Sequence, residues 1–328
     1  MNLSHYQSTN TPAQQDRLAE LIAPFGVTRF MNWQRTNGSA VATVGDLPIG
    51  ISGATGNWSA FSGVPITDCI ALANRVGSRP WLCVPHLATA ETIKWMVAET
   101  LEQAIHRPIF EFSNELWNDI FAQKAAIAPM GGTSHQIEMT RLIKEVAGDS
   151  ADVVLSGQFW RPEMVIELAE RINDPSILIG VAPYVGGKTR SADYPTIEQI
   201  GAAMRDQIAS ARIVMTTLVN TIGRCRLVAY EGGLHLVARR DGGAGERRLF
   251  RDYNRSADAG EVTAALWESW IELGGGIVCP YSAATVYSNE WTGEDAGDFF
   301  GHCEAVKGTI LPLPKYTAVK RLLGRRCF

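Results

Sequence analysis

Two glutamates of this 328-residue chain each stand at the end of a short apolar run. Glu115 follows the run in IFEFSNELWN (109–118), and Glu231 follows the run in RLVAYEGG (226–233). If both runs are strands of one closed sheet, the two carboxyls can face each other across its mouth. Glycosidic bond cleavage requires such a pair: one carboxyl protonates the departing oxygen, and the other attacks or stabilises the sugar cation.

The elements that must position these carboxyls alternate along the chain as short apolar runs and longer amphipathic ones. The clearest helical spacing has Ile197, Ile200, Met204 and Ile208 on one face, at steps of three or four residues. The pattern predicts strands at 27–33, 80–84, 108–113, 152–157, 177–182, 226–230 and 276–281. It predicts helices at about 13–24, 66–76, 89–105, 133–147, 161–172, 196–220, 258–273 and 314–324.

Continuous apolar strands separated by helices indicate parallel strands that are covered on both faces. An open doubly wound sheet and a closed (β/α)8 TIM barrel both fit this pattern. The glycine-rich stretch GDLPIGISGATG (45–56) matches neither GxGxxG nor GxxxxGK[ST], which argues against an open nucleotide-binding sheet. Length and element order favour the barrel, as a single catalytic domain over 1–328 that could belong to a longer protein. Its first strand is poorly defined or missing, because only MNLSHYQ (1–7) precedes the first helix.

The carboxyl ends of the strands form the active site in barrels of this kind. Here polar and aromatic residues follow almost every predicted strand, while the strand bodies are apolar. The chain has nine tryptophans, a mild excess that is of interest because indole faces stack on sugar rings. The strand-end candidates for substrate binding are Arg29, Trp33, His86, Asn114, Trp117, Trp160, Tyr184, His235, Tyr281 and Trp291.

FEFSNELWN and VAYEGG resemble the acid/base and nucleophile signatures of the clan A glycoside hydrolases, which are retaining (β/α)8 enzymes. With the poorly defined segment counted as the first strand, Glu115 follows the fourth strand and Glu231 the seventh, as the resemblance requires. It implies that Glu115 is the acid/base, that Glu231 is the nucleophile and that Asn114 binds the sugar 2-hydroxyl. It also implies that Tyr184 hydrogen-bonds the nucleophile and, more loosely, that Arg29 is the basic residue beside it. Tyr281 stands about where the clan often has a tryptophan, and Trp291 comes later.

Each candidate also has a purely structural interpretation. Glu111 lies mid-strand between two phenylalanines, which indicates a supporting role for this carboxylate. Two glycines after Glu231 permit an unusual turn that aims its side chain inward. His86 and His235 could equally be hydrogen-bonded structural groups. The arginine-rich segment 239–255 is either a solvated loop or a lid that recognises acidic sugars, because guanidinium pairs bidentately with carboxylate.

Composition and charge restrict the partners. A net charge of -4 gives no reason to expect nucleic acid or an anionic membrane, and no apolar stretch is long enough to cross a bilayer. The six cysteines show neither metal-ligand spacing nor a disulfide framework, and the histidines form no ligand pattern, so we predict no metal and no cofactor. The first residues lack the features of a signal peptide. Localisation and oligomeric state stay open; a fragment of a longer protein could be extracellular or particle-associated.

These observations predict a retaining glycoside hydrolase that cleaves an oligo- or polysaccharide by double displacement. The alternative is a non-catalytic barrel that binds glycan as a module of a larger assembly. The presence of both carboxylates favours the enzyme. The sugar, the linkage and the choice between endo and exo attack do not follow from the sequence.

Overall fold

Six parallel strands form the central sheet, in the spatial order β1-β2-β3-β4-β5-β7. The computed structural model describes residues 1, 3, 12–48, 63–238, 243–285, 287, 298–306 and 309–323. The sheet strands are β1 (Val27–Arg29), β2 (Arg79–Val84), β3 (Ile109–Phe112), β4 (Asp152–Ser156), β5 (Leu178–Val181) and β7 (Leu227–Ala229). Each lies within a strand predicted from the apolar runs, or within one residue of it, although most are shorter than the run that predicts them.

Two further segments complete the barrel at the two edges of this sheet. Beside β7, the amide of Cys279 donates to the Ala229 carbonyl at 2.8 Å, with a parallel bridge between Ala229 and Val278. Beside β1, the Leu3 amide donates to the Arg29 carbonyl at 3.1 Å, and the Arg29 amide donates to the Met1 carbonyl at 2.9 Å. The nitrogen of Met1 also lies 3.2 Å from Cys279 Sγ, so the two edges meet. The poorly defined first strand is therefore the segment that contains Met1 and Leu3.

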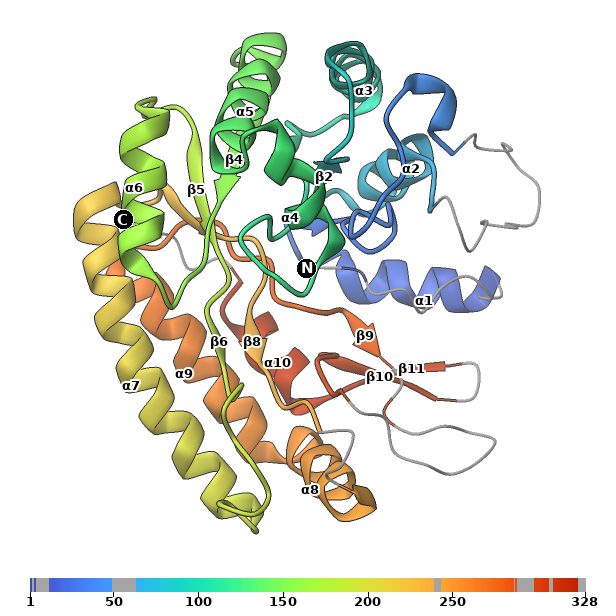
Figure 1. Cartoon of the computed structure of the whole chain (residues 1–328). Coiled ribbons are helices and arrows are strands. Elements are labelled where there is room, and N and C mark those ends of the chain that lie inside the picture. Colours follow the sequence, from blue (N-terminus) through green and yellow to red (C-terminus); the bar gives the residue numbers. More distant parts are fainter. Residues whose placement is uncertain are drawn as a thin grey trace.

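Helices cover the outside of the strands, as Figure 1 shows. They are α1 (Pro12–Ile22), α2 (Ile66–Val76), α3 (Ala90–Gln103), α4 (Ala122–Ile127), α5 (Thr133–Ala147), α6 (Pro162–Ile172), α7 (Ile197–Ile222), α8 (Gly243–Arg255), α9 (Ala257–Leu273) and α10 (Pro314–Arg321). The longest, α7, begins at a capping box in which the Thr196 and Gln199 side chains accept from each other's backbone amides. The predicted helices are all present, whereas α4 and α8 were not predicted.

Alternation along the strands separates two apolar regions, because successive strand side chains point to opposite faces. On β3, Phe110 and Phe112 join the large core between sheet and helices, whereas Ile109 joins a smaller cluster with Trp81 and Val154. This smaller cluster fills the interior of the barrel. Because Glu111 alternates with the two phenylalanines, its side chain enters the barrel interior, where it contacts Trp81.

Short strands extend the architecture beyond the barrel. β6 (Tyr184–Val185) pairs in parallel with β8 (Gly233–Leu234), which continues the neighbouring walls past the ends of β5 and β7. A separate sheet combines β9 (Ala284–Thr285), β10 (Cys303–Val306) and β11 (Thr309–Pro312). None of the described helices is both long enough and apolar enough to span a membrane.

Candidate active site

The chain leaves β3 through a strained turn that carries Asn114 and Glu115. Ser113 and Glu115 have φ angles of 63° and 44°, a left-handed conformation that side-chain-bearing residues rarely adopt. Each such residue costs on the order of 1–3 kcal/mol, and strain of this kind is concentrated at functional sites. The Ser113 amide still donates to the Val84 carbonyl at 2.7 Å, so the turn remains attached to the sheet. Asn114 and Glu115 are both buried, with exposed fractions of 1% and 7%.

The end of β7 uses glycine to make the corresponding turn after Glu231. Gly232 has a φ angle of 145°, and a Cβ atom placed there would lie 3.0 Å from both Pro183 and Trp267. Only glycine is free of both problems at this position. Glu231 is 5% exposed, and Gly233 pairs directly with Tyr184. The predicted glycine turn is therefore present and brings Glu231 and Tyr184 onto adjacent strand extensions.

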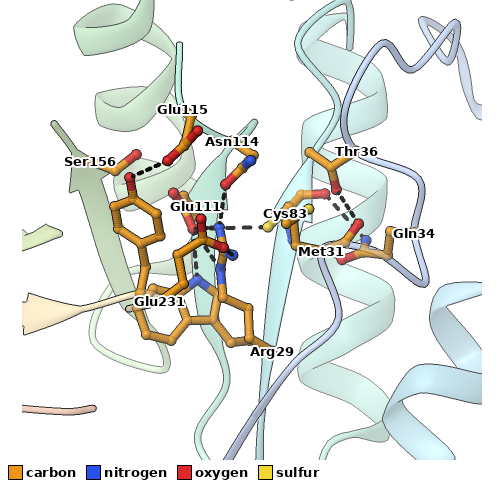
Figure 2. A network of polar contacts seen from close by, with 12 residues as sticks. Arg29, Met31, Gln34, Thr36, Cys83, Glu111, Asn114, Glu115, Ser156 and Glu231 are labelled. Carbon is orange, nitrogen blue, oxygen red and sulfur yellow. Dashed lines mark hydrogen bonds and ion pairs between the residues drawn. The ribbon is translucent and has the colours of Figure 1, made fainter. Parts of the chain in front are cut away.

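Arg29 lies at the floor of the site and contacts several of its side chains (Figure 2). Its Nη2 and Nε atoms donate to Glu111 Oε2 at 2.8 and 3.1 Å, and the Trp81 indole donates to the same oxygen at 3.1 Å. Arg29 Nη1 reaches Glu231 Oε2 at 3.3 Å, and its Nη2 also donates to Asn114 Oδ1 at 2.9 Å. A single buried guanidinium therefore links the middle of β3 to the residues that follow the ends of β3 and β7.

Asn114 and Glu115 have further partners at the mouth. Asn114 Nδ2 donates to Asn37 Oδ1 at 3.0 Å, which together with Arg29 fixes the orientation of the Asn114 amide. Glu115 Oε2 accepts from the Asn118 amide at 2.8 Å, and Tyr230 Oη lies 3.4 Å from Glu115 Oε1. Because Tyr230 immediately precedes Glu231, this contact connects the end of β7 to the turn after β3.

Burial raises the pKa values of both glutamates, and their mutual repulsion adds to this effect on Glu231. The pKa of Glu231 rises to about 8 through burial and the neighbouring charge of Glu115, against the opposing effect of Arg29. The pKa of Glu115 also rises because of burial, and the hydrogen bond from Asn118 opposes this. Two interacting carboxyls of this kind titrate as a pair. The free site therefore holds a proton between them in the neutral range.

Tyr184 supplies a neutral donor to this pair. Burial and the charge of Glu231 hold the pKa of Tyr184 well above its usual range, so the hydroxyl stays protonated. It donates a hydrogen bond to Glu231, which lowers the pKa of that carboxyl. The Tyr184 ring also packs edge-on against His235 and Phe300, with centroid distances of 5.3 and 6.0 Å.

Phe300 lies among the aromatic residues beside the two carboxyls. Its ring centroid is 5.1 Å from that of His235 and 5.3 Å from that of Tyr281. The Tyr281 hydroxyl accepts from Asn32 Nδ2 at 2.9 Å, which connects this cluster to the segment after β1. Tyr184, His235 and Tyr281 therefore form one aromatic wall with Phe300.

The other predicted side chains are less closely associated with the carboxyls. Trp33 is 7% exposed and packs on Phe30, so little of its face is available for a sugar. Trp160 is 43% exposed and donates its indole N–H to the Tyr184 carbonyl, which leaves it at the rim. Trp117 is half-buried, with no hydrogen-bond partner for its indole among the described residues.

His86 is buried just after β2, and burial lowers its pKa. Trp291 lies outside the described residues.

Two expectations from the sequence need correction. From residue 243 onward, the arginine-rich segment is helix α8 rather than a loop, because Phe250 and Tyr253 pack one face of it into the core. Its Arg255 pairs with Glu304 at 2.9 Å, so this guanidinium already has a carboxylate partner. Cys225 belongs to a disulfide, although the spacing of the six cysteines predicts no disulfide framework. Among the described residues, no group of three potential metal ligands is found.

Several residues of the site were not predicted as candidates. Gln123 donates to Asn37 Oδ1 at 2.7 Å and to the Asn114 carbonyl at 2.9 Å, and so supports the Asn114 amide. It lies in α4, a short helix whose apolar spacing gives no signal. Phe300 follows a loop with no strand pattern, so its approach to Tyr184 has no signature in the sequence. Tyr230 could have been found, since it directly precedes Glu231.

Comparison with known proteins identifies the fold. No family model matches the chain, and no curated protein matches it significantly. A thermostable mutant of a xylanase from Cellvibrio japonicus superposes with a TM-score of 0.58 at 13% identity, over 98% of this chain and 96% of that one. An endo-1,4-beta-xylanase from Penicillium canescens gives a TM-score of 0.58 at 13% identity, over 99% and 94% of the two chains.

A beta-glucuronidase from Ruminococcus gnavus matches with a TM-score of 0.51 and 12% identity, over 95% of this chain but 46% of its own. All three are glycoside hydrolases by name, and at these identities the likeness concerns the fold. The chain therefore has the (β/α)8 barrel fold of these structures, and the predicted fold class is confirmed.

Proposed function

We propose that the protein is a retaining glycoside hydrolase in which Glu231 is the nucleophile and Glu115 is the acid/base. The observation that carries the proposal is the burial of these two carboxyls at one end of the barrel, where Arg29 contacts Glu231 and Tyr230 contacts Glu115, and where burial raises both pKa values. Two buried carboxyls whose charges repel each other destabilise the folded protein. A purely structural role therefore does not explain why the barrel holds both of them. Paired carboxyls with elevated pKa values in one cleft are typical of acid/base chemistry.

The contacts of the pair support an assignment of roles. Arg29 and the Tyr184 hydroxyl both contact Glu231, and both stabilise negative charge on it. Glu115 has no cation within ion-pairing distance among the described residues, which favours the proton on Glu115. The working form of the site would therefore be an ionised Glu231 opposite a protonated Glu115.

The reaction would proceed in two steps. Glu231 attacks the anomeric carbon while Glu115 donates its proton to the departing glycosidic oxygen, which yields a glycosyl-enzyme and a free alcohol. Glu115, now ionised, removes a proton from a water molecule that attacks the same carbon and releases Glu231. Asn114, held by Arg29 and Asn37, would present its remaining N–H to the sugar 2-hydroxyl.

The substrate class is an oligo- or polysaccharide. A wall of Tyr184, His235, Tyr281 and Phe300 beside the carboxyls provides the apolar faces on which pyranose rings pack. Since structural neighbours are xylanases by name, xylan and its oligosaccharides are the first substrates to test. Retention implies carboxyl groups ~5–5.5 Å apart, against ~6.5–9.5 Å for inversion.

The first experiment measures reducing-sugar release across a polysaccharide panel, with Glu231→Gln as the blank. Glu231→Gln should abolish release, and NMR of the first product should show the anomeric configuration of the substrate. Glu115→Ala should lose about 10²–10⁴-fold on a poor leaving group and much less on an activated aryl glycoside.

Glu304→Gln is the matched control, because Glu304 is also buried but belongs to the separate sheet of β10. Its activity should stay close to wild type. Equal losses of Glu115→Ala on both aglycones would contradict the acid/base role. Glycan binding without hydrolysis over the whole panel would instead identify the chain as a binding module.

A further inference from the structure

A cavity of about 240 Å³ opens beside the candidate active site and is not used by the proposed chemistry. Among the described residues its lining comes from the segment after β1, and consists of Met31, Asn32, Arg35, Thr36 and Asn37. The volume equals that of roughly eight water molecules, which is enough for one monosaccharide.

The cavity shares two of its lining residues with the site. Asn37 accepts the hydrogen bond from Asn114 Nδ2, and Asn32 donates to the hydroxyl of Tyr281. One asparagine therefore joins the cavity to the turn that carries Glu115, and the other joins it to the aromatic wall. A glycan bound across the carboxyls would have this cavity within reach of an adjacent unit or substituent.

Arg35 gives the cavity its charge. It is half-buried, and no carboxylate pairs with it among the described residues. This sets it apart from Arg29, which pairs with Glu111, and from Arg255, which pairs with Glu304. Its backbone has a φ angle of 51°, held by the bond from the Arg35 amide to the Asn32 carbonyl at 3.1 Å. A strained residue with an uncompensated charge is thus held at the wall of a cavity.

We infer that the Arg35 cavity binds a carboxylate-bearing sugar of the uronic acid type. Guanidinium matches a carboxylate in bidentate geometry, and the Asn32 and Asn37 amides suit the remaining hydroxyls. The charge of Arg35 has a second effect, because an acidic substrate is repelled by the ionised Glu231. A nearby cation without an internal partner offsets that repulsion.

This inference rests on the proposed function. It assigns the recognition of acidic sugars to Arg35 and not to the arginine-rich segment that contains α8. Of the four α8 arginines, Arg255 is paired with Glu304 and Arg251 with Asp252, and neither Arg247 nor Arg248 is among the described lining residues of the cavity. Arg35 has no such partner in the described part of the chain and lines a cavity that adjoins the carboxyls.

The test measures binding to the inactive Glu231→Gln protein by calorimetry. The probes are glucuronic-acid-substituted xylo-oligosaccharides, the same oligosaccharides after carboxyl reduction, and a set that carries sulfate esters in place of the uronic acid. The acidic set should bind roughly tenfold tighter than the reduced set, since one charge-assisted contact contributes that much. Adding Arg35→Gln should remove the difference, and Arg35→Lys should retain part of it.

Arg141→Gln is the control, because Arg141 is exposed, lines a different cavity and donates to the Arg171 carbonyl. It should leave the preference unchanged. Preference for the acidic set should also weaken as salt rises, and this measurement needs no Arg35 variant to fold.

Equal binding of the acidic and reduced sets would overturn the inference while leaving the hydrolase proposal intact, as would a preference that survives Arg35→Gln. Tighter binding of the sulfated set would assign the cavity to sulfate esters and refute the uronate. If no oligosaccharide binds and the active protein releases no sugar from any polysaccharide of the panel, both proposals fail.

Discussion

The floor and the mouth of the barrel hold carboxylates in opposite circumstances. At the floor, Glu111 is fully buried and one of its oxygens accepts from Arg29 and from the Trp81 indole. At the mouth, four residues further along the chain, Glu115 has among the described residues only an amide and a distant tyrosine hydroxyl as partners. Strand β3 thus carries one acid with strong internal partners, and the turn after it carries a second acid with weaker ones.

The difference follows from geometry within the barrel. Strand side chains that point inward below the mouth are surrounded by other strands, so a charge there must find an internal partner or carry a large desolvation penalty. Beyond the strand ends the chain turns freely, and a carboxyl can be left with few partners at the expense of local strain. The three predictions below test this contrast, beginning with the largest effect.

Replacing the floor cation should destabilise the fold strongly. Arg29→Met leaves Glu111 and Glu231 without their cation in a buried site, which should lower the free energy of unfolding by about 3–5 kcal/mol. Urea unfolding monitored by circular dichroism measures this loss.

Arg75→Met provides the comparison, because the Arg75–Asp16 pair is exposed and should change stability by only about 0–1 kcal/mol. Adding Glu111→Gln to Arg29→Met should recover part of the loss. Two similar losses for Arg29→Met and Arg75→Met would show that the floor pair carries no special structural role.

The carboxyls at the mouth should make the folded protein less stable as the pH rises. Glu115 and Glu231 titrate as a pair, and the pKa of Glu231, about 8 in the folded state, lies above its value in the unfolded chain, so the folded pair binds one extra proton between about pH 4.5 and 8. Stability is therefore greatest below this window and falls as the pH rises through it, by on the order of 2–4 kcal/mol. In Glu231→Gln the unfolding free energy should depend on pH much more weakly. Parallel curves for the two proteins would contradict the role of the mouth as a source of instability.

The carboxylate at the floor should also change the pKa values of the carboxyls at the mouth. The negative charge of Glu111 contributes to the raised pKa values of both Glu115 and Glu231. Glu111→Gln should lower both, so both limbs of the pH–rate profile move to lower pH. Profiles of kcat/KM against pH for the wild type and the variant give the answer. If the acidic limb of the profile does not move in a folded Glu111→Gln protein, the charge at the floor does not affect the carboxyls at the mouth.

The sequence predicted the fold through its longest patterns and failed where the pattern was short. Apolar runs predicted the six sheet strands because buried parallel strands need continuous hydrophobic side chains. Met1 and Leu3 fill the place of the first strand through backbone bonds alone, and so short a segment has no periodicity to detect. Helix α8 was missed because its many arginines outweigh the few apolar residues, such as Phe250, that fix it to the core.

The candidate site shows the same division. Glu115, Glu231, Asn114 and Arg29 could be placed together because each stands at or near a strand end, and the structure brings them into one network. Phe300 and Gln123 could not be placed, since their positions depend on tertiary packing of irregular segments. The catalytic roles, the organisation as a single domain and the absence of nucleic acid or membrane partners stay predictions.

Tyr230 has a consequence for the stereochemistry of the reaction. It precedes one carboxyl in the sequence, and its phenol ring extends rigidly to within 3.4 Å of the other. A flat ring cannot stretch or fold, so it acts as a fixed spacer across the cleft. In the proposed reaction, the separation of the two carboxyls, which distinguishes retention from inversion, would therefore include the length of one aromatic side chain that takes no part in bond breaking.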